Sequence, residues 1–287
     1  IGIGNENWGP QYIERLQIFQ DIIKKKYPEI EIVASSGTDP EGDRFNFLDK
    51  ELRAMNIDII DEHFYRSPEW FLANASRYDN YDRNGAKIFA GEYASHSKNS
   101  KRPEYKNNWE AALSEAAFLT GVERNAAVVQ LASYAPLFAH IDGWQWTPDL
   151  IWVDNLNVFL TPSYYVQQLF STNKGTQVVP IAIAGKTIAG EDGLYSSAVV
   201  NKDNNELIIK VVNTNKEATK IQIDLKGVKK GQGKAVLITL QHEDPLAINE
   251  VGKVPSVVPK TTELHYKSKK LDLDMQGQSI VVIKIKL

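Results

Sequence analysis

The chain starts with Ile1-Gly-Ile-Gly-Asn-Glu-Asn-Trp8, a short apolar run that leads into a glycine, an asparagine and a glutamate. A second stretch, Lys87-Ile-Phe-Ala-Gly-Glu-Tyr-Ala94, is built in the same way, with an apolar run, a glycine, a glutamate and an aromatic residue. Each stretch is typical of a β-strand with a carboxylate near its end. If one fold brings these ends together, Glu6 and Glu92 form a candidate catalytic pair.

The composition indicates a globular protein, because 43% of the 287 residues are hydrophobic and 24% are charged, enough for one large core or two smaller ones. A net charge of -3 predicts no basic surface, so nucleic acid is not expected as a partner. No apolar run approaches the roughly 18 residues that a membrane span needs. The chain has no cysteine, which excludes disulfides and thiolate metal sites.

Residues 1–135 show strand patterns that alternate with helix patterns. Strands are predicted at Ile1–Glu6, Glu29–Ser35, Ile57–Tyr65, Ala86–Tyr93 and Ala126–Tyr134. Helices are predicted from Pro10 to Tyr27, around Leu48, Leu52 and Met55, from Ser67 to Tyr78, and over Trp109–Arg124 with one buried stripe. This alternation predicts a parallel sheet with helices outside it, either a barrel or a doubly wound sheet. No glycine-rich phosphate loop follows any strand, which argues against nucleotide binding.

The pattern changes in the second half of the chain. Residues 136–175 are expected to be irregular and aromatic up to a helix opened by Thr161-Pro162. From Thr176 onwards, short runs such as Lys220–Lys226 and Ile283–Leu287 alternate apolar and charged residues. We therefore predict a catalytic α/β domain over residues 1–175 and a structural antiparallel β-sandwich over residues 176–287.

Polar residues gather at the ends of three predicted strands: Asn5 and Glu6, Asp61-Glu62-His63 with Tyr65, and Glu92 with Tyr93. In a parallel barrel the carboxyl ends of the strands carry the active site. Two carboxylates placed there would supply the general acid and the nucleophile that cleave a glycosidic bond.

Each of these carboxylates also has a structural interpretation. Glu6 could complement the dipole of the following helix. Glu92 could be a salt-bridged acid at the edge of the core, but it shares a strand face with Ile88 and Ala90, where an unpartnered charge is costly. The joint placement at two strand ends favours the catalytic interpretation.

The other polar and aromatic candidates remain open between function and packing. Asp61, Glu62 and His63 look like a metal cluster, but strand alternation places Glu62 on the opposite face, so no metal site is predicted. His63 and Tyr65 share a face and could contact a substrate or orient a carboxylate; the alternative for His63 is a buried, hydrogen-bonded histidine. Three tryptophans are candidates for stacking on sugar rings or for packing: Trp8, Trp144 and Trp146.

An ordered set of motifs over essentially the whole chain resembles glycoside hydrolase family 51, the α-L-arabinofuranosidases. The motifs are Gly4-Asn5-Glu6, Asp61-Glu-His-Phe-Tyr65, Gly91-Glu92-Tyr93, Ser133-Tyr-Ala-Pro-Leu-Phe138, Trp146-Thr-Pro-Asp-Leu-Ile-Trp152 and Thr161-Pro-Ser-Tyr-Tyr165. The resemblance implies a (β/α)8 barrel followed by a β-sandwich, hydrolysis with retention of configuration, and no cofactor.

The resemblance also implies a role for each matching residue. Glu6, at the end of the fourth barrel strand, would be the acid/base, and Glu92, at the end of the seventh, would be the nucleophile. Asn5 would bind the arabinose next to the cleaved bond, and His63 and Tyr65 would line the same pocket. Apart from the resemblance, Trp8 is predicted to bind substrate as a sugar-stacking side chain. The retaining mechanism requires carboxyl groups about 5–5.5 Å apart.

A complete barrel has eight strands, and only five are predicted before the sandwich. We therefore expect a partial barrel of about five βα units, strands four to eight, in the C-terminal part of a longer protein. Its two open sheet edges are an aggregation liability and leave homo-oligomer formation open. We also predict that this chain is catalytically weak or inactive alone. The expected substrate is an arabinose-containing polysaccharide or oligosaccharide such as arabinan or arabinoxylan, and a periplasmic or extracellular location would suit it.

Two alternatives remain. A retaining endo-acting glucanase or xylanase would share the two-carboxylate arrangement. A non-catalytic carbohydrate-binding module would instead rely on the aromatic residues 140–170 and on the sandwich.

Overall fold

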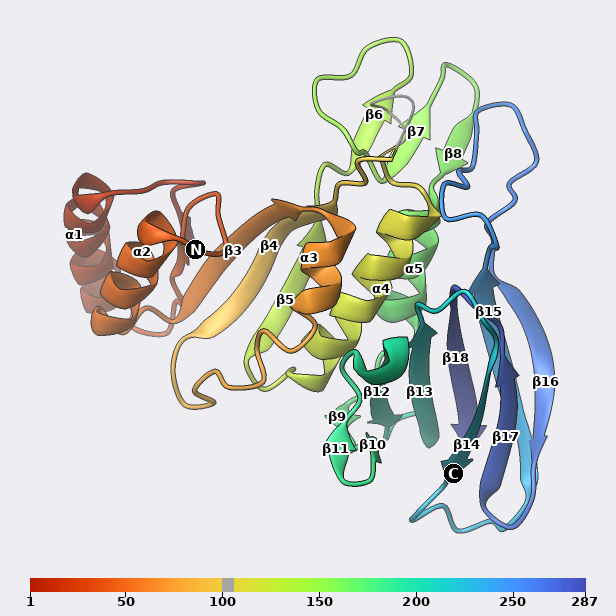
Figure 1. Ribbon diagram of the computed structural model, residues 1–287. Coiled ribbons are helices and arrows are strands. Elements are labelled where there is room, and N and C mark those ends of the chain that lie inside the picture. The colour runs from red at the N-terminus through yellow and green to blue at the C-terminus, as the bar shows by residue number, and fades with distance from the viewer. Residues whose placement is uncertain (100–105) are drawn as a thin grey trace. The chain divides into compact units, whose positions relative to one another are not determined.

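The computed structural model describes residues 1–99 and 106–287, and the chain divides into two compact units (Figure 1). The first unit consists of Ile1–Arg66, Tyr78–Ala94 and Asn125–Ala135. The second consists of Ser67–Arg77, Ser95–Arg124 and Pro136–Leu287. The chain therefore leaves and re-enters the first unit twice before the second unit is completed.

The first unit is built on a five-stranded sheet in which the spatial order of the strands follows their order in the chain. The strands are β1 (Gly2–Ile3), β2 (Val33–Ser35), β3 (Ile59–Arg66), β4 (Lys87–Ser95) and β5 (Val129–Tyr134). The pairings of β1 with β2, of β2 with β3 and of β4 with β5 are parallel. Helices α1 (Pro10–Lys26) and α2 (Asp43–Ala54) form the first two crossovers, so the expected parallel sheet is confirmed.

β1 is shorter than the expected strand Ile1–Glu6 because the backbone adopts left-handed conformations directly after it. The φ angle is 84° at Gly4 and 52° at Glu6. Neither value fits an extended strand, and at a glutamate such a conformation costs about 1–3 kcal/mol. Glu6 therefore lies in a loop that follows β1. The expected strand Glu29–Ser35 is likewise reduced to its last three residues.

Helix α1 begins at Pro10 as predicted, since proline is well tolerated in the first helical turn. It buries Tyr12 and Leu16, but Phe19 and Ile22, which continue the same apolar spacing, are each 52% exposed. Apolar side chains of α1 therefore remain uncovered by the described residues.

The second unit contains α3 (Pro68–Ala73), α4 (Trp109–Arg124) and α5 (Pro162–Thr172). α3 ends before the predicted limit at Tyr78. α4 has the predicted bounds, but every residue from Ala111 to Gly121 is buried, whereas the sequence predicted a single buried stripe. The reason is that α4 contacts α3, α5 and strands of the following β-domain. Among the helices of the described ranges, none combines the length and apolar character that a bilayer crossing requires.

The segment between β5 and α5 is more regular than expected. It forms a three-stranded sheet of β6 (Phe138–His140), β7 (Ile151–Val153) and β8 (Val158–Leu160), in that order. α5 then begins as predicted, with the Thr161 side chain accepting a hydrogen bond from the Tyr164 backbone N–H.

The remaining strands form the predicted antiparallel sandwich. One sheet has six strands in the order β16-β15-β18-β13-β12-β9, and the other pairs β14 with β17. The bounds are β9 (Gln177–Val178), β12 (Leu194–Asn201), β13 (Glu206–Asn213), β14 (Thr219–Asp224), β15 (Gly233–Gln241), β16 (Lys260–Tyr266), β17 (Lys270–Met275) and β18 (Ser279–Lys286). A hairpin of β10 (Ala182–Ile183) and β11 (Lys186–Thr187) and a 3-10 turn at Glu191–Gly193 lie between β9 and β12. The core between the two sheets is apolar and includes Ile209, Val211, Leu271 and Ile283.

A buried ion pair joins the sandwich to α4 within the second unit. Lys210 of β13 is fully buried, and its ammonium group donates hydrogen bonds to the carboxylate of Glu123 on α4 and to the backbone carbonyl of Asn173. The hydroxyl of Ser197 on β12 donates to the same carboxylate. Because a buried charge is costly without its partner, this network fixes α4 on the sandwich sheet.

The buried carboxyl of Glu115, in the middle of α4, predicts a pH-dependent stability. Burial raises the pKa of Glu115 to about 8, against the opposing effects of the Ser95 N–H, Ser163 and Gln167. Because the pKa of Glu115 is higher in the folded state than in the unfolded state, its protonated carboxyl contributes to the free energy of unfolding. The contribution is complete at pH values below the unfolded-state pKa of about 4.5. This contribution is lost as the pH rises through about 8.

We therefore expect Glu115→Gln to gain stability relative to the wild type between pH 6 and pH 9, measured as the free energy of unfolding in urea. Glu110→Gln, at a partly exposed position in the first turn of the same helix, should keep the wild-type pH dependence. Parallel pH profiles for the wild type and Glu115→Gln would contradict the assignment of a neutral carboxyl.

Candidate active site

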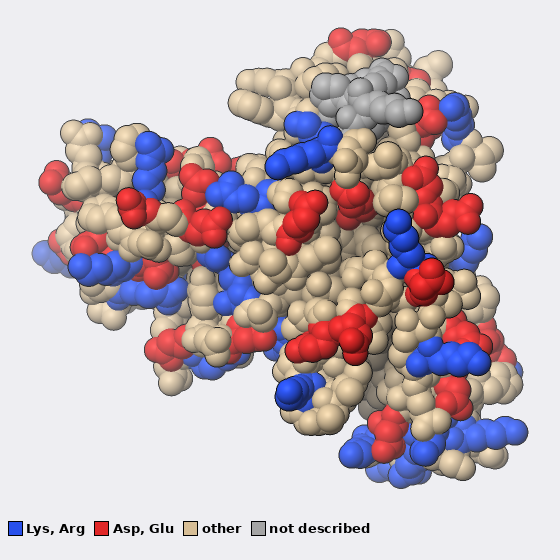
Figure 2. All heavy atoms as spheres, in the orientation of Figure 1, with Lys and Arg blue, Asp and Glu red and all other residues tan. Residues whose placement is uncertain are grey.

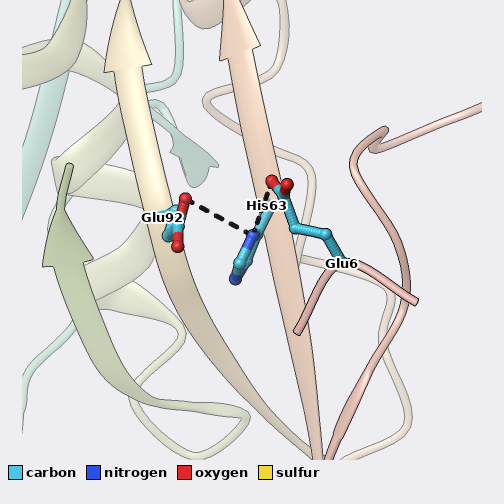
Figure 3. Close-up of side chains that lie close together, drawn as sticks. All are labelled: Glu6, His63 and Glu92. Carbon is cyan, nitrogen blue, oxygen red and sulfur yellow. Dashed lines mark hydrogen bonds and ion pairs between the residues drawn. The ribbon is translucent and has the colours of Figure 1, made fainter. Parts of the chain in front are cut away.

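Four of the residues predicted from the sequence meet in the first unit. Figure 3 shows three of them: Glu6, His63 and Glu92. Glu6 comes from the loop after β1, His63 and Tyr65 from β3, and Glu92 from β4. Nδ1 of His63 lies 3.1 Å from Oε1 of Glu6 and 3.6 Å from Oε2 of Glu92. One oxygen of each glutamate and one ring nitrogen of His63 all lie within 4.8 Å of one another.

Glu92 is positioned by its strand and by a tyrosine. The register of β4 against β5 shifts between Ala90 and Tyr93, which marks an irregularity of the bulge type at this glutamate. Such irregularities re-aim side chains and are frequent next to active sites. The hydroxyl of Tyr65 donates a 2.6 Å hydrogen bond to Oε2 of Glu92, so one carboxylate oxygen is held.

Tyr65 remains a neutral donor in this arrangement. Burial raises the pKa of its hydroxyl most, and the hydrogen bond to Glu92 and the charges of Glu92 and Glu6 raise it further. The phenol proton is therefore retained throughout the ordinary pH range and can stabilise the Glu92 carboxylate.

Asp61 belongs to the same cluster, although no role in the site was predicted for it from the sequence. Its Oδ2 lies 3.1 Å from Nε2 of His63, whose side chain is only 2% exposed. The signal that could have identified it was the i, i+2 spacing of Asp61 and His63, which places both on one face of a strand.

The close approach of Asp61 to β4 requires a glycine opposite it. A Cβ atom built on Gly91 would lie 1.9 Å from Oδ1 of Asp61. Gly91 therefore leaves the space that Asp61 occupies. The glycine of the Gly91-Glu92-Tyr93 motif thus has a steric role in the site.

The charge of His63 follows from its surroundings. Burial alone would lower the pKa of its imidazole, but the hydrogen bond and charge of Asp61, the hydrogen bond of Glu6 and the charge of Glu92 outweigh it. Together they raise the pKa of His63 to about 9. An imidazole that carries both protons offers no free lone pair to a cation.

Glu62 lies on the opposite side of β3, as strand alternation predicted. It is fully buried, and its carboxylate accepts hydrogen bonds from the hydroxyls of Tyr78 and Tyr81, both at 3.1 Å. Asp61, Glu62 and His63 therefore do not converge on one point.

Two other residues predicted to bind substrate are not part of the contacts described above, and their roles stay predictions. In the described ranges, Asn5 is exposed, and the ring of Trp8 is 58% exposed with the guanidinium of Arg44 4.4 Å from its centre. In the second unit, Trp144 packs edge-on against Trp152, with ring centres 6.4 Å apart. Trp146 is 67% exposed.

The sequence matches two family models. Residues 91–279 match the α-L-arabinofuranosidase C-terminal domain, and residues 1–83 match the α-L-arabinofuranosidase 1 domain.

Individual relatives agree with this match. An extracellular exo-α-L-arabinofuranosidase of Streptomyces chartreusis is 48% identical over 181 residues, which are 63% of this chain and 21% of that protein. A probable α-L-arabinofuranosidase A of Aspergillus terreus is 28% identical over 291 residues, which are 99% of this chain and 42% of that protein. The chain thus spans less than half the length of these two relatives.

Solved structures agree in fold. The arabinose-bound MgGH51 α-L-arabinofuranosidase superimposes with a TM-score of 0.81 at 28% identity, over 99% of this chain and 44% of that one. An α-L-arabinofuranosidase from Thermotoga maritima, solved with arabinose, gives a TM-score of 0.80 at 21% identity, over 100% of this chain and 66% of that one. The parallel sheet and the sandwich thus form a partial (β/α)8 barrel followed by a β-sandwich domain. With a family model that matches most of its length, the chain belongs to the α-L-arabinofuranosidases of glycoside hydrolase family 51.

Proposed function

We propose that this chain carries the two catalytic carboxylates of a retaining glycoside hydrolase that removes terminal α-L-arabinofuranosyl residues from arabinan- or arabinoxylan-type polysaccharides. The observation that carries the proposal is that Glu6, in the loop after β1, and Glu92, within β4 of the same sheet, meet around His63. Fold alone would not support it, because barrels host many chemistries.

The separation of the two carboxylates favours retention of configuration. Retaining glycosidases hold their carboxyl groups about 5–5.5 Å apart, whereas inverting enzymes need about 6.5–9.5 Å to admit a water molecule. An oxygen of Glu6 and an oxygen of Glu92 lie within 4.8 Å of each other, which is nearer to the retaining separation than to the inverting one.

The roles follow from the contacts. Oε2 of Glu92 is held by Tyr65, so Oε1 would attack the anomeric carbon while the bond to the leaving oxygen breaks. Glu6 would give its proton to that oxygen. In the second half of the reaction Glu6 would take a proton from water, whose oxygen attacks the anomeric carbon and releases Glu92.

The substrate class rests on the family and on the surface. The relatives described above are named as α-L-arabinofuranosidases, and two solved neighbours were obtained with arabinose. Figure 2 shows acidic and basic side chains interspersed over the visible face, and the net charge is only -3. A neutral sugar polymer suits such a surface better than a polyanion does.

Replacing the two glutamates should separate their roles. In the complete gene product, Glu6→Gln should lower kcat/KM for an arabino-oligosaccharide by about 10²–10⁴-fold, because its leaving group needs protonation. Its effect on a 4-nitrophenyl arabinofuranoside should be much smaller, because nitrophenolate leaves unprotonated. Glu92→Gln should abolish turnover of both substrates.

Glu62→Gln, on the opposite face of β3, is the matched control and should retain wild-type activity per folded molecule. Preferential turnover of 4-nitrophenyl xylopyranoside over the arabinofuranoside would favour an endo-acting xylanase type. Unchanged activity in Glu6→Gln and Glu92→Gln would show that the carboxylates are not catalytic.

Removing the hydroxyl of Tyr65 tests the positioning of Glu92. A hydrogen bond to a charged group contributes about 1.5–3 kcal/mol, so Tyr65→Phe should lower kcat about 10–100-fold with little change in KM. Tyr81→Phe removes a hydroxyl that faces Glu62 and should leave kcat unchanged. Equal kinetic effects of the two substitutions would refute a specific role for Tyr65.

The chain alone should be a poor catalyst. Among the described strands, β1 and β5 each pair with only one neighbour in the parallel sheet, and Ile18, Phe19 and Ile22 of α1 are more than half exposed. A small displacement of catalytic groups costs about 10²-fold, so kcat/KM of the 287-residue chain should be at least about 100-fold below that of the complete gene product. Equal values would show that these 287 residues suffice.

A further inference from the structure

The three carboxylates around His63 play different parts because they face different ring nitrogens. Asp61 faces Nε2, whereas Glu6 and Glu92 both face Nδ1. An ionised Asp61 can only accept a hydrogen bond, so Nε2 keeps its hydrogen. The position that can gain or lose a proton is therefore Nδ1, on the side of the catalytic pair.

Nδ1 of His63 and Oε1 of Glu6 are 3.1 Å apart, within hydrogen-bond distance. With one proton between them, either the ring donates to the carboxylate or the carboxyl donates to the ring. This contact therefore allows a single proton to be shared between the ring and the carboxyl.

We propose that Glu6 and His63 hold the catalytic proton jointly, and that Asp61 is a positioning residue that controls how firmly His63 retains it. The inference rests on the proposed function, because Glu6 is a proton donor only in that reaction.

The proton balance of the reaction is unchanged by this sharing. The one shared proton passes from Nδ1 of His63 to Glu6, and the leaving oxygen takes it from Glu6 as it departs, so that neither group then holds it. When water attacks the glycosyl-enzyme, its proton returns to Glu6 and from there to Nδ1. The pair thus begins and ends each turnover with the same single proton.

Among the described residues, the charged groups that face His63 act in the same direction, and the nearby hydroxyls are neutral. Asp61, Glu6 and Glu92 all favour the charged ring. The Tyr65 hydroxyl donates to Glu92 and stays neutral. On the far side of Asp61, the Tyr12 hydroxyl also stays neutral, because burial raises its pKa to about 12; it donates to Ile3 and accepts from the Ser35 N–H.

The decisive experiment compares the titration of His63 with the pH dependence of catalysis in the complete gene product. The protein is labelled with ¹³C at its histidine rings, and the His63 signal is identified by its loss in His63→Gln. In Asp61→Asn the pKa of His63 should fall by at least about one unit, the usual effect of losing an opposite charge at this distance. Glu6→Gln should lower it as well.

The basic limb of kcat/KM for an arabinofuranoside should move to lower pH in Asp61→Asn by the same amount as the His63 titration, with KM nearly unchanged. Glu62→Gln, the neighbouring residue on the other face of β3, should shift neither the titration nor the limb. A merely structural role of Asp61 would lower activity at every pH without moving the limb.

Gly91→Ala provides a second route if Asp61→Asn fails to fold. It displaces Asp61 without removing its charge, because the new Cβ would collide with Oδ1, and it should also lower the pKa of His63. Gly85→Ala, with its nearest contact at 3.5 Å, is the control.

The outcomes are distinguishable. An unchanged pKa of His63 in both Asp61→Asn and Gly91→Ala overturns the role of Asp61. A lowered pKa of His63 with an unmoved basic limb overturns the joint holding of the proton. Absence of arabinofuranosidase activity in the wild type refutes the proposed function, whereas the NMR titrations still decide whether Glu6, His63 and Asp61 share a proton.

Discussion

The nearly buried imidazole of His63 faces carboxylates from three segments of the chain: β3, β4 and the loop after β1. Two glutamates as close as Glu6 and Glu92 repel each other when both are ionised, and a cation between them offsets that repulsion. The short β1, the left-handed backbone at Glu6 and the glycine at position 91 all serve this arrangement. The geometry of the first unit is therefore set as much by charge as by the packing of its apolar side chains.

Much of this site was predictable from the chain, because strand periodicity assigns faces. The alternation over β3 correctly separated Glu62 from Asp61 and His63, and the rule that parallel strands end at one edge placed Glu6 near Glu92. The contact between Asp61 and His63 was not predicted, because a shared strand face does not show which side chains touch. That contact depends on the space above Gly91, which only three-dimensional packing reveals.

The misjudged elements have equally specific reasons. A positive φ angle at Glu6 does not change the hydrophobic pattern, so the strand predicted from the sequence is longer than β1. Strands of three residues such as β6 are too short for any periodicity to show. α4 is buried on all sides because neighbours from distant parts of the chain enclose it, and a single sequence window cannot contain that information. The antiparallel strands of the sandwich, by contrast, are long enough for period two to be unmistakable.

The ion pair between Lys210 and Glu123 makes the sandwich an integral part of the second unit and not an appended module. The ammonium group has no exposed surface, and burial lowers the pKa of Lys210 against the opposing attraction of Glu123. Cutting the chain near residue 175 would leave Glu123 on α4 without its counter-charge. Exchange of the sandwich between relatives, by recombination or by engineering, is therefore constrained to partners that present a lysine at this point of the sheet. For any such exchange, the helices and the sandwich of the second unit act as one piece.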